Sequence, residues 1–471
     1  MRLARNAPSD PKGPLRERAP RLSPAALVML LLVLPAGPTA GQGIDDALAF
    51  EDLGFTRALT PGARVSGLAG AYTSAADDVH ALLYNPAGLT RVKRVELGLG
   101  LQRQRDNLDN RFLGNPTDLE RTSSTLDFIA GAYPLVTYRG SFVVALGAYR
   151  ILSTDLDVLT RGSSTITTTN GDYRMQQSGD IFSYNFGAGL DVSPYLSVGA
   201  NLFFLDGTVE HLTQFSFDLL PPPAGFADGD PHRQSVLDEG RGDLDGFGAT
   251  LGFQVHPHPL LRLGVSINTP TLINLDRSST VENIIFFFNA LDDLETSVVT
   301  RGVDYRLPLR VTGGVSYAPR NFLLSAELGY ADWTEATIDG KLVKDRNLRS
   351  VFRKVVSVRG GIEYTIPGAP IRLRGGYAYT PDPLRYLQSD RIEDWCRTMG
   401  TSTCLRRFGT TIEKARVETE RQMIAGGVGV LVGSSLMIDA SYESVIGKKA
   451  ISTLQEERAS QRVLVSTAYR F

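Results

Sequence analysis

Four arginines in the second half of the chain have the chemistry to bind an anion. Arg310, Arg359, Arg372 and Arg374 each lie in or beside a run that reads as a β-strand. A guanidinium held away from bulk water binds a carboxylate through charged hydrogen bonds, which contribute about 1.5–3 kcal/mol. We therefore take these four as candidates to hold the anionic head group of a ligand. The alternative for each arginine is a structural ion pair between strands, such as Glu363 with Arg372 or Arg374.

A second set of candidate residues is apolar and lies in two long connections, residues 207–241 and 275–305. Three adjacent phenylalanines outside a core should either be buried or bind something apolar. We therefore expect the two connections to form an uptake site for a hydrophobic molecule, or else to pack together as a lid. The candidate residues are Phe215, Phe217 and Phe226 in the first connection, and Ile284, Ile285, Phe286, Phe287, Phe288 and Leu291 in the second.

Motifs for catalysis or metal binding are absent from the sequence. There is no His-Glu-x-x-His, no Gly-x-Ser-x-Gly and no phosphate-binding glycine loop, and the five histidines are scattered. We predict a protein that is not an enzyme and that uses no cofactor and no metal. Its net charge of −2 gives no reason to expect a nucleic-acid partner.

The elements that must position the candidate residues are β-strands. In the last segment Val463, Val465, Tyr469 and Phe471 share one face, and mostly polar or small residues fill the other. An amphipathic edge strand of a soluble protein is the alternative for this segment alone, but the period-2 pattern repeats along the chain. The expected strands are 92–104, 123–133, 140–151, 179–192, 195–206, 242–256, 259–274, 306–318, 321–334, 352–366, 369–380, 420–432, 434–445 and 460–471.

Connections between these segments alternate between tight and long, as in barrels with short periplasmic turns and long extracellular loops. An apolar face against lipid and a polar face toward a wet lumen is also what such strands require. We predict an all-β fold, a transmembrane antiparallel β-barrel of about 14 strands over residues 92–471. The expected location is the bacterial outer membrane, with lipid around a monomer.

The first residues read as an export signal. Basic residues precede an apolar run from Ala25 to Leu34, and small residues follow up to Gly41. That run is shorter than the roughly 20 residues needed to span a bilayer as a helix. We therefore predict a signal peptide over residues 1–41.

Cys396 and Cys404 lie together in the long connection 381–419. Two thiols so close in an exported protein favour a local disulfide that constrains an extracellular loop.

The segment before the barrel carries the most specific pattern. A glycine- and alanine-rich run is followed by Ala76-Asp77-Asp78 and then by Asn85-Pro86-Ala87. This resembles the N-terminal hatch of the FadL family of outer-membrane transporters for long-chain fatty acids and aromatic hydrocarbons. The resemblance implies that residues 42–91 form a hatch that plugs the lumen. Asp77 and Asp78 would hold the hatch by accepting backbone N–H bonds or by pairing with lumen arginines.

The same resemblance implies a function. It predicts transport of a hydrophobic ligand, such as a long-chain fatty acid, through the plugged barrel. In that family the loops after the fifth and seventh strands carry helical segments that form a first hydrophobic groove, and these loops match 207–241 and 275–305. The alternative is a barrel that does not transport but serves as a shuttle or anchor for secreted surface proteins.

Overall fold

A computed structural model describes residues 58–112, 115–164, 169–219, 227–342, 352–383, 386–387, 415–416, 420–451 and 454–471. The predicted signal peptide, Phe226, Cys396 and Cys404 lie outside these residues. No helix in the described part of the chain is long and apolar enough to span a membrane.

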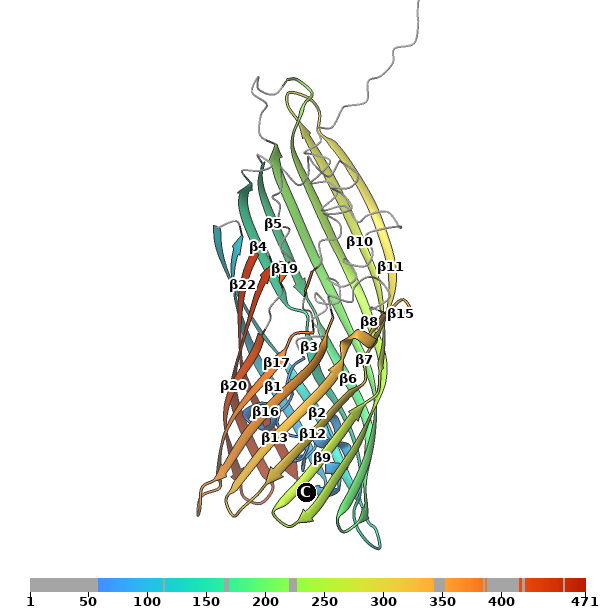
Figure 1. Ribbon diagram of the computed structural model, residues 1–471, viewed down its shortest axis with the longest axis vertical. Helices are drawn as coiled ribbons and strands as arrows, with labels where there is room; N and C mark the ends of the chain where they lie inside the picture. The colour runs from blue at the N-terminus through green and yellow to red at the C-terminus, as the bar shows by residue number, and fades with distance from the viewer. Residues whose placement is uncertain are drawn as a thin grey trace, which may run out of the picture. The chain divides into compact units, whose positions relative to one another are not determined.

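Within these ranges, fourteen antiparallel strands form a closed barrel (Figure 1). The sheet closes where β1 pairs with β22, so that Glu96 lies opposite Arg470. The predicted strand number is confirmed. The strands are β1 (Glu96–Phe112), β2 (Asn115–Leu135), β3 (Phe142–Ser153), β6 (Asp180–Ser193), β7 (Leu196–Leu219), β8 (Pro231–His258), β9 (Leu261–Asn268), β12 (Arg310–Tyr317), β13 (Phe322–Asp332), β16 (Lys354–Thr365), β17 (Ile371–Pro381), β20 (Glu420–Val432), β21 (Leu436–Ile451) and β22 (Leu454–Arg470).

Side chains alternate between the outside of the barrel and its lumen. On β7, Leu202 and Phe204 point outward and are 48% and 55% exposed, whereas Asn201 is buried. An outer face of this kind suits lipid, because charged side chains facing the bilayer midplane cost about 2–4 kcal/mol. Charged residues of the inner face, including Glu327, Asp439 and Glu443, are buried in the lumen.

Tight turns join the strands at one end of the barrel, as predicted. They span residues 136–141, 194–195, 259–260, 318–321, 366–370 and 433–435. Gly368 and Gly433 adopt positive φ angles of 78° and 64° in two of them, which a residue with a side chain would resist. We call this the short-turn end, which in outer-membrane barrels faces the periplasm.

At the other end the prediction of long loops is wrong for two connections. β7 and β8 continue as strands through most of 207–241, and 275–305 is a hairpin of β10 (Thr271–Phe287) and β11 (Asp293–Leu307). β4 (Leu156–Ser164) and β5 (Thr169–Ser178) extend the same upper sheet. Beyond the bilayer the outer face of a strand meets water, so the ladder persists while the outward apolar alternation disappears. The period-2 apolar pattern in the sequence therefore ends before the strands themselves end.

Strands of the wall are interrupted where these extensions begin. Pro270 separates β9 from β10, and Pro308 separates β11 from β12; neither proline has an N–H for a ladder bond. On the next strand, β13 gives way to η2 (Trp333–Glu335), β14 (Thr337–Ile338) and β15 (Lys341–Leu342). Trp333 and Ile338 are buried, and Arg310 lies at the first position of β12 beside the break.

The described part of the predicted hatch, residues 58–91, lies in the lumen, and we call it the lumenal segment. It contains α3 (Ala63–Gly67), α4 (Ala81–Tyr84) and η1 (Pro86–Arg91), drawn in blue in the lower half of Figure 1. η1 packs against β6, β7 and β8, and α3 against β17, β20 and β21. Glycines on the inner wall make room for it: a Cβ on Gly199 would lie 2.3 Å from the carbonyl carbon of Pro86. A small separate sheet pairs β18 (Tyr386–Leu387) with β19 (Ala415–Arg416).

Candidate functional site

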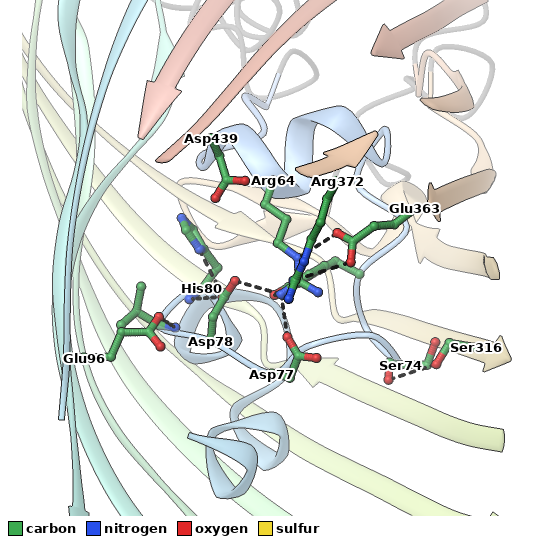
Figure 2. A network of polar contacts seen from close by, with 12 residues as sticks. Arg64, Ser74, Asp77, Asp78, His80, Glu96, Ser316, Glu363, Arg372 and Asp439 are labelled. Carbon is green, nitrogen blue, oxygen red and sulfur yellow. Dashed lines mark hydrogen bonds and ion pairs between the residues drawn. The ribbon is translucent and has the colours of Figure 1, made fainter. Parts of the chain in front are cut away.

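The centre of the lumen holds a buried ion-pair network around Arg64 of the lumenal segment (Figure 2). Its guanidinium lies 2.5 Å from Asp77 and 3.2 Å from Asp78, and its Nε donates to Glu363 of β16 at 3.2 Å. Asp77 also pairs with Arg262 of β9 at 3.4 Å. Burial would raise the pKa of Asp77, but the charges of Arg64 and Arg262 outweigh it and lower that pKa. The network ties the predicted acidic pair to the barrel wall.

Asp78 forms a second buried pair with His80. The His80 Nδ1 lies 3.1 Å from the Asp78 carboxylate, and its ring packs edge-on against Phe128 at 4.4 Å. Burial opposes the charge on both residues, yet Asp78, Asp127 and Glu96 together raise the pKa of His80. His80 and Arg64 in turn hold the pKa of Asp78 well below its ordinary value. We therefore expect His80 to carry a positive charge in the docked segment.

This pair makes docking of the lumenal segment depend on pH. Because the pKa of His80 is raised on docking, its contribution is complete below the ordinary value near 6.5 and is lost as pH rises through the raised value. A charged hydrogen bond contributes about 1.5–3 kcal/mol, so hydrogen exchange in residues 62–84 should accelerate roughly ten-fold or more across that window, beyond the intrinsic pH effect. A His80→Gln variant should lose this extra step. Equal pH profiles in the two proteins would contradict the assignment.

Carboxylates of the wall also accept hydrogen bonds from the backbone of the lumenal segment. Glu327 of β13 accepts from the N–H groups of Tyr72 and Thr73 at 3.1 and 2.8 Å. Asp127 of β2 accepts from Gly62 at 2.7 Å, and Glu96 of β1 from Val79 at 3.3 Å. A segment with little regular structure needs such partners, since buried N–H groups must be satisfied. The period-2 pattern directs charges such as Glu327 toward the lumen, but it does not indicate that they bind backbone.

The Asn-Pro-Ala motif makes a sharp turn that starts η1. The Asn85 carboxamide oxygen accepts from the Ala87 N–H at 3.2 Å, which caps the helix, and Pro86 occupies its first turn. The Asn85 amide donates to the carbonyl of Thr73 at 2.8 Å and to that of Phe253 in β8 at 3.1 Å. Asn85 thus joins two parts of the lumenal segment to the wall.

Three of the four candidate arginines are engaged in ion pairs. Arg359 lies 2.5 Å from Glu327, and Arg374 contacts Glu363 at 2.7 Å and Asp439 at 2.6 Å. Arg372 lies 3.6 Å from Glu363, so the predicted pairing of Glu363 with these two arginines is confirmed. These three side chains have structural roles next to the lumenal segment.

Arg310 differs from the other three. It has no ion pair or side-chain hydrogen bond with any described residue, and the charge that acts on it most is another cation, Arg359. It lies opposite Ala331 of β13, on the side of the lumenal segment away from the short turns. A half-buried guanidinium with a cationic neighbour favours an anion.

A cluster of apolar side chains lies in the lumen beside Arg310, and we call it the apolar belt. On β7, Gly199 meets the lumenal segment, and Phe203, Leu205 and Val209 follow it toward the far end. Lumens of such barrels are ordinarily polar, so this belt is unexpected. It comprises Leu152, Ile181, Phe203, Leu205, Val209, Leu244, Ile273, Leu275, Val303, Tyr305, Leu307, Ala331, Trp333, Ala336, Ile338, Phe352 and Val355.

The predicted uptake residues lie on strands and not on loops. Phe215 and Phe217 belong to β7, while Ile284, Ile285, Phe286 and Phe287 belong to β10 and are half-buried. Phe288 and Leu291 lie in the turn after β10 and are 39% and 94% exposed. β8 runs between the two sets, so they lie in one sheet; helices do not form over these described residues, which corrects that expectation.

An open polar cavity of about 750 Å³ lies nearer the long-strand end. It is lined by charged and amide side chains of β2, β4, β5, β7 and β8, among them Arg121, Asp157, Glu210 and Arg241. Its polar walls do not match a hydrophobic ligand.

Comparisons with known proteins agree with this architecture. A family model described as BamG matches residues 57–402. Among curated proteins, none matches the chain. Solved structures that resemble it include the toluene transporter TodX of P. putida, with 12% identity, a TM-score of 0.58 and 87% and 98% of the two chains covered.

Two further solved structures have similar folds. A FadL homologue of Pseudomonas aeruginosa has 14% identity and a TM-score of 0.54, with 88% of this chain and 99% of that chain covered. The CymD monoaromatic hydrocarbon channel has 15% identity and a TM-score of 0.52, with 87% and 97% covered. The resemblance to the FadL family is confirmed at the level of the fold, and the chain is a bacterial outer-membrane β-barrel.

Proposed function

Because the chain belongs to the BamG family and folds as those transport barrels do, we propose that it passes hydrophobic molecules across the outer membrane. The observation that carries this proposal is the apolar belt in the lumen, with Arg310 at its lower margin. Burial of apolar surface would hold an alkyl or aromatic body. The guanidinium would hold an anionic head group, so a long-chain fatty acid fits both parts.

We propose that residues 42–91 act as the plug of this pathway. The lumenal segment is fixed to the wall by Arg64, by Asn85 and by the carboxylates that bind its backbone. A ligand seated on the apolar belt would rest against this plug. The toluene and monoaromatic hydrocarbon named for two similar structures are uncharged, which makes the role of Arg310 the point to test.

An Arg310→Gln variant should weaken oleate binding to the purified protein by about ten-fold or more, because one charged hydrogen-bonded pair is lost. Binding of a neutral alkyl-aromatic should change little. The comparison is made by titrating both ligands against wild type, Arg310→Gln and Arg310→Lys, with the lysine variant keeping most of the oleate affinity.

A Phe286/Phe287/Phe288→Ser triple variant examines the predicted uptake residues in the same titrations. If neither ligand binds wild type, passage of hydrophobic molecules is ruled out. If that triple variant then abolishes retention of a surface protein, the shuttle or anchor function takes its place.

A further inference from the structure

The upper sheet has an open edge at β11. β11 pairs with β10 along its whole length, from Thr271 opposite Leu307 to Ile285 opposite Asp293. On its other side, β14 pairs only with Tyr305 and Arg306, and the backbone of Asp339 bonds to Asp304 at 2.8 Å. Above Asp304, none of the residues that the structure describes pairs with this side of the strand.

The hydrogen bonds of Asp304 show which backbone N–H and C=O groups of β11 point to the open edge. Its carbonyl accepts from the Asp339 N–H and its N–H donates to the Asp339 side chain, so both groups point to the open edge. Backbone groups alternate along a strand, and β11 has no register shift against β10. The N–H and C=O groups of Leu294, Thr296, Val298, Thr300 and Gly302 therefore point away from β10.

This edge lacks most of the usual protection against pairing. Protein edges are commonly blunted by charged side chains, proline or a bulge. Residues 293–302 contain no proline, lysine or bulge, and their charged residues are Asp293, Glu295 and Arg301. Thr296, Val298, Val299 and Thr300 are β-branched, which favours strand pairing. All of residues 293–302 are exposed, with Val298 71% exposed. The edge can therefore accept an added strand, a recurrent mode of peptide recognition.

A second copy of the chain does not fit this edge. Two copies in one membrane share one orientation relative to its normal, so their β11 strands would meet parallel. In a two-fold pair the same backbone groups would then face each other, N–H against N–H and C=O against C=O, so the two edges cannot form a ladder. Another protein therefore fits the edge better than a second copy does.

Charge around the strand tip indicates the chemistry of that protein. Within residues 227–235 and 282–302, the Lys and Arg residues are Arg233 and Arg301. The acidic residues there are Asp228, Asp230, Glu282, Asp292, Asp293 and Glu295. We propose that the open edge of β11 binds an extended, basic segment of another protein as an additional strand. This goes beyond passage of hydrophobic molecules and uses a different part of the barrel.

Two synthetic peptides that alternate Thr and Val, one flanked by lysines and one by glutamates, provide the test by fluorescence anisotropy. The protein is held in nanodiscs of zwitterionic lipid. The lysine peptide should bind saturably and the glutamate peptide about ten-fold more weakly or not at all. Val298→Pro removes an edge N–H without touching the β10 ladder and should weaken the lysine peptide about ten-fold. Val298→Thr keeps the N–H and should bind as wild type.

Heat-modifiable migration on gels establishes that each variant is a folded barrel. Equal binding of the two peptides, or a Val298→Pro variant that binds like wild type, overturns the proposal. A homodimer in nanodiscs or detergent that Val298→Pro dissolves also overturns it, and assigns the edge to a second copy.

Discussion

Removing residues 43–89 should give a folded barrel with a much larger single-channel conductance in planar bilayers. The lumenal segment fills the lower lumen from η1 beside β7 to α3 beside β21, so its loss opens a water path. The strands keep every ladder hydrogen bond, because the segment contributes no strand to the barrel. Conductance equal to that of wild type would contradict a lumenal plug.

The control for this deletion concerns the wall carboxylates that lose their partners when the lumenal segment is removed. Glu327, Glu363 and Asp127 would lose partners but would gain water, which satisfies them. The shortened protein should therefore still show heat-modifiable migration on gels. Loss of that behaviour would mean that the segment is also needed for folding.

An Arg64→Met substitution should release the lumenal segment while leaving it covalently in place. Arg64 is buried among Asp77, Asp78 and Glu363, and truncating one partner of a buried ion pair costs about 3–5 kcal/mol. The opening equilibrium of residues 62–92 should rise by roughly a hundred-fold or more, as measured by hydrogen exchange. Conductance should then flicker between closed and open levels.

The matched control for Arg64 is Arg241. Its side chain is 60% exposed and lies near Glu210 and Asp243 in the upper sheet. Exposed pairs contribute about 0–1 kcal/mol, so Arg241→Met should change neither exchange nor conductance. If both arginine variants behave alike, the network around Arg64 does not hold the plug.

The strands within the bilayer could be predicted because the side chains on the lipid-facing side of each strand must be apolar. Residues such as Leu202 and Phe204 had to be apolar, and the period-2 pattern followed. Above the bilayer that requirement ends, so the outer parts of β7, β8, β10 and β11 read as loops. For the same reason the sequence pattern predicted loops for Phe286 and its neighbours, which lie on β10.

Part of the lumenal site was also predictable. The pairing of Glu363 with Arg372 and Arg374 follows from charges that must face inward on neighbouring strands. Arg64 was not predicted as a site residue, because the lumenal segment has no regular hydrophobic repeat from which the direction of its side chains could be inferred. One feature of the sequence indicates the apolar belt. Residues Leu202 to Leu205 are all apolar, so the lumen-facing positions of this run are apolar as well as the lipid-facing ones.

The isolation of Arg310 could not be read from the sequence. Its position at the start of β12 resembles that of the other arginines, and only the break at Pro308 and the packing around it decide its partners. The signal peptide over residues 1–41 and the disulfide between Cys396 and Cys404 remain predictions.

Photolabelling with a fatty acid that carries a diazirine on its chain tests the central claim most directly, because it reports where the hydrophobic body lies. Mass spectrometry should find the label on the inward residues Phe203, Leu205 and Trp333 of the apolar belt, and excess oleate should remove it. Label confined to the lipid-facing residues Leu202 and Phe204, and unaffected by oleate, would contradict passage of hydrophobic molecules through the lumen.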